Sequence, residues 1–173
     1  MYTKDFIKDV FIKEIEQMTI DTSGNRVHSY IGFSLVCQCI EVLGACFDKY
    51  DWESEKLSKR RFRRAIKELF PEKYKQFNNE NNKYDLYKNL RCPMIHQMRP
   101  GKYIALSERI HEQEARKSNL HLTILNSGQL ILIYEDFLYD FIKACKKLIN
   151  LIESGNIKTN KILSENISVR NIN

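Results

Sequence analysis

Arg91 and His96 are the two residues of this sequence whose types and spacing best suit catalysis. A histidine exchanges protons near neutral pH, and a guanidinium binds two phosphate oxygens in a fixed planar geometry. Cleavage of RNA by its own 2′-hydroxyl requires a proton acceptor for that hydroxyl and positive charge on the phosphate. The pair therefore predicts phosphodiester chemistry without a metal, with His96 as acid or base and Arg91 holding the phosphate.

The five-residue spacing limits how these two side chains can meet. Five steps of an ideal α-helix separate two residues by about 7.5 Å along the axis and about 140° around it, so they would not share a face. Pro93 lies between them and could interrupt the helix. In a symmetric dimer, Arg91 of one chain could instead face His96 of the partner subunit. The catalytic interpretation therefore predicts a helix break at Pro93 or a homodimer.

A structural role for the same residues is the alternative. Arg91 would then pair with a carboxylate such as Asp85 or Glu108, and His96 would cap or hydrogen-bond locally. Cys92 is interpreted as a small buried residue rather than a nucleophile, because no second histidine follows at helical spacing to activate it.

The surrounding segment, residues 86–101, reads LYKNLRCPMIHQMRPG. It resembles the Arg-x(4–6)-His motif of HEPN proteins, closely in this segment and loosely over much of the chain. The resemblance implies a mostly α fold, an antiparallel bundle of about five helices that is commonly a homodimer. Many HEPN proteins are described as metal-independent ribonucleases of toxin or defence systems, so we expect no cofactor.

Two positions depart from the HEPN pattern, and two functions stay open. Cys92 stands where catalytic members often carry a polar residue, and Met98 stands where some toxins carry the tyrosine that a nucleotidyltransferase partner modifies. The first function is a HEPN-like domain that binds RNA and cleaves it at a dimer cleft. The second is a non-catalytic helical module that binds a nucleotide or an operon-encoded protein partner.

A second cluster of charge lies on the helix predicted over residues 55–70. Lysines and arginines fill much of residues 56–67, and the chain has a formal net charge of +6. Such a face suits phosphate binding, and the alternative is a solvated helix face partly neutralised by Glu53, Glu55 and Glu68. The residues expected to bind nucleic acid are Lys59, Arg60, Arg61, Arg63 and Arg64, with Arg99 and Lys102 adding charge beside the motif.

The spacing of apolar residues predicts the elements that position both clusters. The run over residues 30–47 is apolar on nearly every side, which indicates a central buried helix. Further helices are expected over residues 4–20, 55–70, the segment leading into Arg91, and 134–152.

A small β-hairpin is expected before the last helix. Alternating apolar residues mark residues 120–124 and 129–133, with Asn126-Ser127-Gly128 as the turn, and 103–106 could supply a third strand. We therefore predict one mostly helical domain over residues 1–155, with a turn at 22–27 and a polar tail over 156–173.

Composition excludes several classes of protein. No apolar run approaches the roughly 18 residues needed to span a bilayer, and the N-terminus lacks a secretory pattern, so we expect a cytoplasmic protein that does not contact membranes. The five cysteines are expected to be reduced, and no zinc-binding spacing is present, so no metal site is expected. The histidines at 28, 111 and 121 are interpreted as surface or strand residues.

Overall fold

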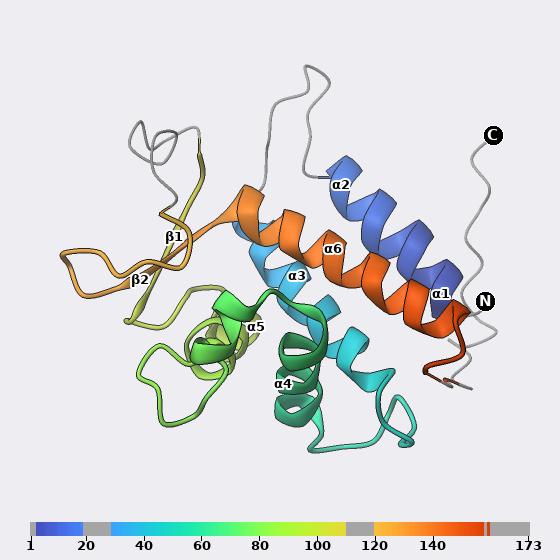
Figure 1. Ribbon diagram of the computed structural model, residues 1–173. Coiled ribbons are helices and arrows are strands. Elements are labelled where there is room, and N and C mark those ends of the chain that lie inside the picture. The colour runs from blue at the N-terminus through green and yellow to red at the C-terminus, as the bar shows by residue number, and fades with distance from the viewer. Residues whose placement is uncertain (1–2, 19–28, 110–119, 158, 160–173) are drawn as a thin grey trace.

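The computed structural model describes residues 3–18, 29–109, 120–157 and 159. Helices dominate this part of the chain, which confirms the mostly α class, although the specific HEPN arrangement stays a prediction (Figure 1). The turn predicted at 22–27 and nearly all of the tail predicted beyond 155 lie outside the described residues.

The first helix is continuous but has a wider middle. α1 (Thr3–Phe6), the π-helical segment η1 (Ile7–Glu14) and α2 (Ile15–Met18) follow one another without a break, since Phe6 and Ile15 both keep right-handed helical dihedrals. Ile7, Phe11 and Ile15 are buried, which confirms the predicted amphipathic helix.

The central helix α3 (Ser29–Ala45) packs closely against its neighbours because it carries small residues at the contacts. A Cβ added at Gly44 would lie 1.8 Å from the backbone carbonyl oxygen of Arg61, so α3 and α4 (Ser58–Leu69) touch backbone to backbone there. At Gly32 the ring of Tyr134 occupies the space a side chain would need.

α4 is amphipathic, as its sequence predicts, but Arg61 lies on its buried side. Phe62, Ala65, Ile66 and Leu69 are buried. Phe70 is extended, as expected before a proline, so α4 ends there and the short 3₁₀ segment η2 (Glu72–Phe77) begins after Pro71.

The helix that carries the Arg91 motif does not break at Pro93. The π-helical segment η3 (Tyr87–Arg91) continues directly into α5 (Cys92–Gln97), and Arg91 and Cys92 are both right-handed helical. Pro93 follows the wider η3 turn, and the Asn89 carbonyl four residues before it accepts instead from the Gly101 N–H at 2.7 Å. The helix break invoked to bring Arg91 and His96 together is therefore absent.

The predicted hairpin forms in part, and its return strand also pairs in parallel with a third segment. β1 (Ile104–Ser107) pairs with β2 (Leu130–Ile133), with Ile104 opposite Leu130. The return strand at 129–133 is thus confirmed, and the segment at 103–106 supplies its partner. The other expected strand, 120–124, is not a regular strand, because Leu122 adopts a left-handed φ of 64°. It is nevertheless bonded to the return strand, since the Leu122 N–H donates to the Ile131 carbonyl at 2.9 Å and the Ile131 N–H donates to the Thr123 carbonyl at 3.0 Å.

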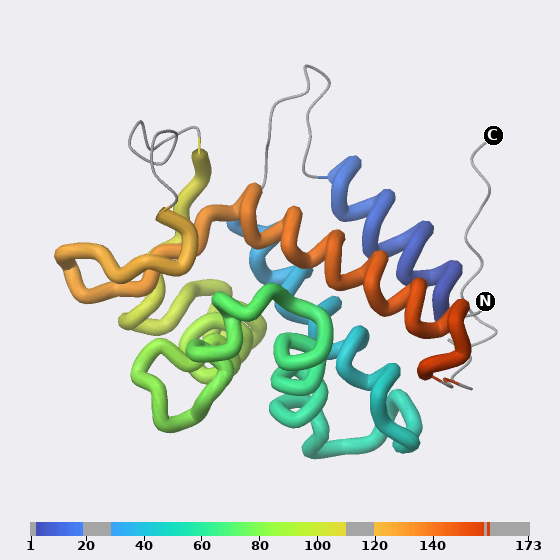
Figure 2. Tube along the Cα trace, viewed as in Figure 1, coloured from blue at the N-terminus to red at the C-terminus, as the bar shows by residue number. Residues whose placement is uncertain are grey.

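The last helix, α6 (Tyr134–Glu153), closes the core and ends before Gly155, whose φ is 73°. It runs beside the first helix, with the rings of Phe11 and Phe141 6.3 Å apart and Lys4 3.6 Å from Glu153 (Figure 2). No helix in the described part of the chain is long and apolar enough to cross a membrane.

His121 corrects one expectation, because it is buried rather than at the surface. The Ile133 N–H donates to its Nδ1 at 3.1 Å, so Nε2 carries the proton and donates to Tyr74 Oη at 2.8 Å. Tyr74 in turn donates to Asp140 at 3.0 Å, and Lys73 lies 2.8 Å from that carboxylate. This buried chain of bonds ties β2 to η2 and α6.

Candidate nucleic-acid interface

Arg91 and His96 do not meet within one chain. The Arg91 side chain is only 12% exposed, and its Nη2 forms an ion pair with Glu41 of α3. Its guanidinium also lies over the ring of Tyr87, 5.7 Å from the centroid. His96 is exposed near the end of α5 and makes no side-chain hydrogen bond to the part of the chain that the structure describes. The unbroken helix formed by η3 and α5 therefore keeps the two side chains apart.

In the structural alternative Arg91 pairs with a carboxylate, and it does so here, but with Glu41 and not with Asp85. Asp85 is committed to Arg63 instead, in a pair whose carboxylate is 1% exposed. Glu41 was not predicted because it lies fifty residues away in sequence, and the charge pattern of one helix carries no information about such a distant partner. A single chain thus presents a neutralised arginine and a separate exposed histidine.

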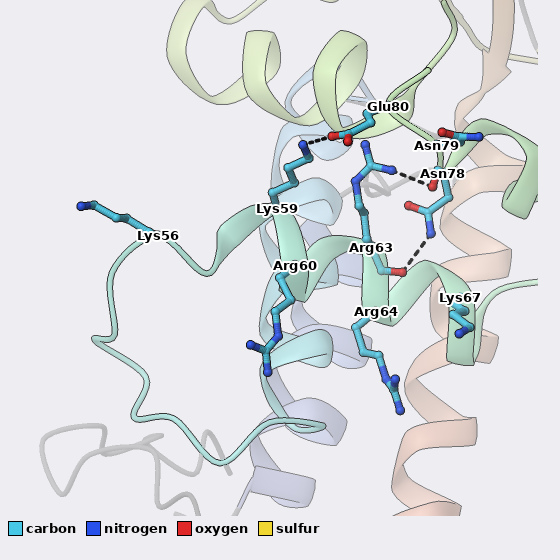
Figure 3. Close-up of a pocket in the computed structure, with 9 residues that line it drawn as sticks. All are labelled: Lys56, Lys59, Arg60, Arg63, Arg64, Lys67, Asn78, Asn79 and Glu80. Carbon is cyan, nitrogen blue, oxygen red and sulfur yellow. Dashed lines mark hydrogen bonds and ion pairs between the residues drawn. The ribbon is translucent and has the colours of Figure 1, made fainter. Parts of the chain in front are cut away.

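The positive residues of α4 line an open groove of about 760 Å³ (Figure 3). The second wall is the asparagine-rich loop that follows η2. Among the residues that the structure describes, Glu80 is the single acid in the lining, so the groove carries a strong excess of positive charge. The lining residues are Lys56, Lys59, Arg60, Arg63, Arg64, Lys67, Asn78, Asn79 and Glu80.

Two of these cations hold the groove together. Arg63 donates to the Asn78 carbonyl at 2.7 Å, and Asn78 Nδ2 donates back to the Arg63 carbonyl at 2.9 Å. Lys59 forms an ion pair with Glu80 on the same loop, which lowers the pKa of the Glu80 carboxyl below its ordinary value, chiefly through their hydrogen bond. Figure 3 shows Lys59 and Arg63 reaching from α4 toward this loop.

The remaining arginines of the groove, Arg60 and Arg64, have solvent-exposed side chains. Arg60 lies over the ring of Tyr50 at 5.1 Å, and Arg64 lies over the ring of Phe47 at 5.6 Å. Both side chains are exposed and point away from the asparagine-rich loop (Figure 3). Arg64 also approaches Glu68 at 3.3 Å, an exposed contact that contributes little stability. These two arginines can bind an anion without breaking the fold.

Arg61 must be removed from the predicted nucleic-acid surface. Its side chain is 5% exposed and forms an ion pair with Asp48 at 2.9 Å. It also donates to the carbonyls of Asp51 at 2.7 Å and Trp52 at 3.0 Å. The sequence contained the signal, because Arg61 stands four residues before Ala65 and therefore shares the inner face of α4.

Arg99 and Lys102 are exposed but do not line the groove. Arg99 Nε donates to Gln97 Oε1 at 3.1 Å, and the Lys102 ammonium lies 4.9 Å from the Tyr103 ring centroid. The predicted set of cations is therefore not gathered in one place.

No group of three or more His, Cys, Asp or Glu in the described part of the chain could hold a metal. The cysteines are free thiols. Burial raises the pKa of Cys39 to about 12, which keeps that thiol protonated. Its environment therefore suits packing rather than nucleophilic chemistry.

A comparison with known proteins adds no relative. No family model, no curated protein and no solved structure matches this chain.

Proposed function

We propose that this chain is a HEPN-like domain that binds RNA through the cationic groove on α4. The supporting observation is that six lysines and arginines line one open groove, in which the described residues include a single acid. Phosphates bound there would release counterions, which is the main source of affinity for a nucleic-acid backbone. The aromatic rings beneath Arg60 and Arg64 restrict both guanidinium groups and so lower the entropy lost on binding.

The experiment compares two matched charge reversals. In Arg60→Glu/Arg64→Glu two exposed cations of the groove become acids, and in Lys143→Glu/Lys146→Glu the same change is made on the exposed side of α6, away from the groove. We expect single-stranded RNA to bind the first variant more than tenfold more weakly than the second at low salt, with a shallower dependence on salt. Equal affinities would reject the groove as the RNA site.

Metal-independent RNA cleavage is the second candidate function, and it requires a homodimer. His96 is exposed, and Tyr30 and Met98 beside it are 44% and 51% exposed, with Tyr30 Oη donating to the Met98 carbonyl at 2.7 Å. A second protomer covering this apolar surface would bury it beside His96 and supply another Arg91. Such a dimer would combine His96 of one chain with Arg91 of the other.

Turnover of a mixed RNA in the presence of a chelator tests this second function. Cleavage by the wild-type protein that is lost in His96→Ala would support a dimeric ribonuclease. Absence of cleavage by both proteins would favour the non-catalytic module, in which the Arg91–Glu41 ion pair is structural and the protein acts by binding RNA, a nucleotide or a protein partner.

A further inference from the structure

A second, smaller pocket of about 230 Å³ lies where α3, α4 and η3 meet. It is separate from the cationic groove, since the two share no lining residue. Its charges balance, because Arg61 is paired with Asp48 and Arg91 with Glu41. The lining residues are Gln38, Glu41, Val42, Ala45, Trp52, Arg61 and Arg91.

Hydrogen-bonding capacity in this pocket is only partly used. Each oxygen of Glu41 accepts one bond, from Ser58 Oγ at 2.6 Å and from Arg91 Nη2, although a carboxylate oxygen can accept two. The Arg91 Nε is buried without an acceptor among the described residues. A buried N–H without a partner is costly. The pocket thus contains an unpaired donor on Arg91 and unused acceptor positions on Glu41.

The combination of groups identifies the kind of ligand. A bare phosphate is disfavoured, because Glu41 would repel it and both arginines are already neutralised. A guanine base is complementary instead: its N1–H and N2–H groups would donate to Glu41, and its O6 would accept from Arg91. Gln38 and the indole of Trp52 supply a further polar contact and an aromatic surface against which a flat base can stack.

We propose that this pocket binds a guanine base of a single-stranded RNA, which rests on the proposed function of the groove. The groove would hold the backbone without regard to sequence, and the pocket would select one base. Phosphate contacts position a nucleic acid whereas base contacts specify it, so the two sites would divide these tasks.

Nucleosides test the pocket separately from the groove because they carry no phosphate. The chain contains one tryptophan, so its fluorescence reports on Trp52 alone. Titration of the full chain with guanosine should change the emission to saturation, with roughly tenfold weaker responses to adenosine and uridine. No change with guanosine, or an equal response to all three nucleosides, would overturn the proposal.

Matched variants locate the effect. Glu41→Gln should abolish the preference for guanosine, whereas Glu55→Gln, an exposed change outside the pocket, should keep it. Because Glu41→Gln weakens an ion pair with Arg91 and could unfold the chain, Gln38→Ala at an exposed lining position is the second variant. Unchanged guanosine binding in Gln38→Ala and in folded Glu41→Gln would place the base elsewhere and overturn the assignment.

RNA hexamers separate this proposal from the proposed function. A uridine hexamer with one central guanine should bind more tightly than the same hexamer with adenine, and the difference should disappear in Glu41→Gln. Tight binding of both hexamers with equal affinity would overturn the guanine pocket and leave the groove intact. Guanosine binding without hexamer binding would support the pocket and reject the groove.

Discussion

Arg60 and Arg61 have the same side chain and are neighbours in α4, yet they serve opposite purposes. Arg60 stands in solvent over the ring of Tyr50, whereas Arg61 is buried and bonded to Asp48 and to the loop that follows α3. One helical step of about 100° makes this difference. The comparison teaches that the cationic run has two functions: its outer members are available to a ligand, and its inner member secures the loop that supports them.

Replacement of Arg61 should give the largest effect, a loss of stability that replacement of an exposed arginine does not cause. Arg61→Ala leaves Asp48 buried without its ion-pair partner, so we expect a loss of about 3–5 kcal/mol in the free energy of unfolding. Urea denaturation measures this loss. The control is Arg64→Ala, an exposed position that should change stability by about 0.5 kcal/mol or less. Similar losses in the two variants would show that burial does not distinguish these arginines.

Acid should act on the buried network around His121. Burial, followed by the nearby charge of Lys73, lowers the pKa of His121 from 6.5 to about 3 in the folded chain. As the pH falls, the unfolded chain therefore binds this proton before the folded chain does. The contribution of His121 to the free energy of unfolding is fully present above pH 6.5 and is lost progressively as the pH drops toward 3. At pH 5 the loss from this residue should be about 2 kcal/mol.

Unfolding of wild type and His121→Gln at pH 7 and pH 5 isolates that contribution. Glutamine does not titrate, so the variant should lose about 2 kcal/mol less than the wild type between the two pH values. Equal losses in the two proteins would show that His121 is not the residue responsible.

Arg60→Ala sharpens the comparison from the exposed side. We expect RNA affinity at low salt to fall about threefold to tenfold, because one phosphate contact is lost, while the free energy of unfolding changes by less than about 0.5 kcal/mol. Filter binding and urea denaturation of the same preparation measure both quantities. A large loss of stability with unchanged RNA affinity would mean that Arg60, like Arg61, supports the fold and binds no phosphate.

Glu80→Gln should give the smallest effect, with the opposite sign. Removal of this acid from the groove frees Lys59 from its ion pair, so RNA affinity should rise about threefold at low salt and converge with the wild type at high salt. Glu72→Gln is the matched control, since Glu72 pairs with Lys75 outside the groove. A similar rise in both variants would indicate a general effect of net charge.

Patterns within one segment predicted much of this molecule. The helical spacing in residues 55–70 predicted the inner face of α4, and the apolar run at 30–47 predicted the buried helix α3. Both succeed because a helix arranges its own residues in a fixed rotation.

Contacts between distant segments could not be predicted in this way. The sequence predicted the return strand at 129–133 and a possible third strand at 103–106, but not that they pair in parallel, because alternation does not indicate strand direction. Likewise the structural alternative paired Arg91 with a carboxylate such as Asp85 or Glu108, but the partner is Glu41, which is brought near by the packing of α3 against η3. His121 was assigned to the surface or a strand, since its partner Tyr74 is forty-seven residues away.

Gly44 determines the rotational phase of α4, because its missing side chain lets the Arg61 backbone rest directly on α3. A single methyl group there would collide with the Arg61 backbone, so α3 and α4 would have to shift apart. The array of charges on the surface would then change although no charged residue had been replaced. The positions of the α4 charges at the surface therefore depend on one steric contact in the core, between Gly44 and the Arg61 backbone.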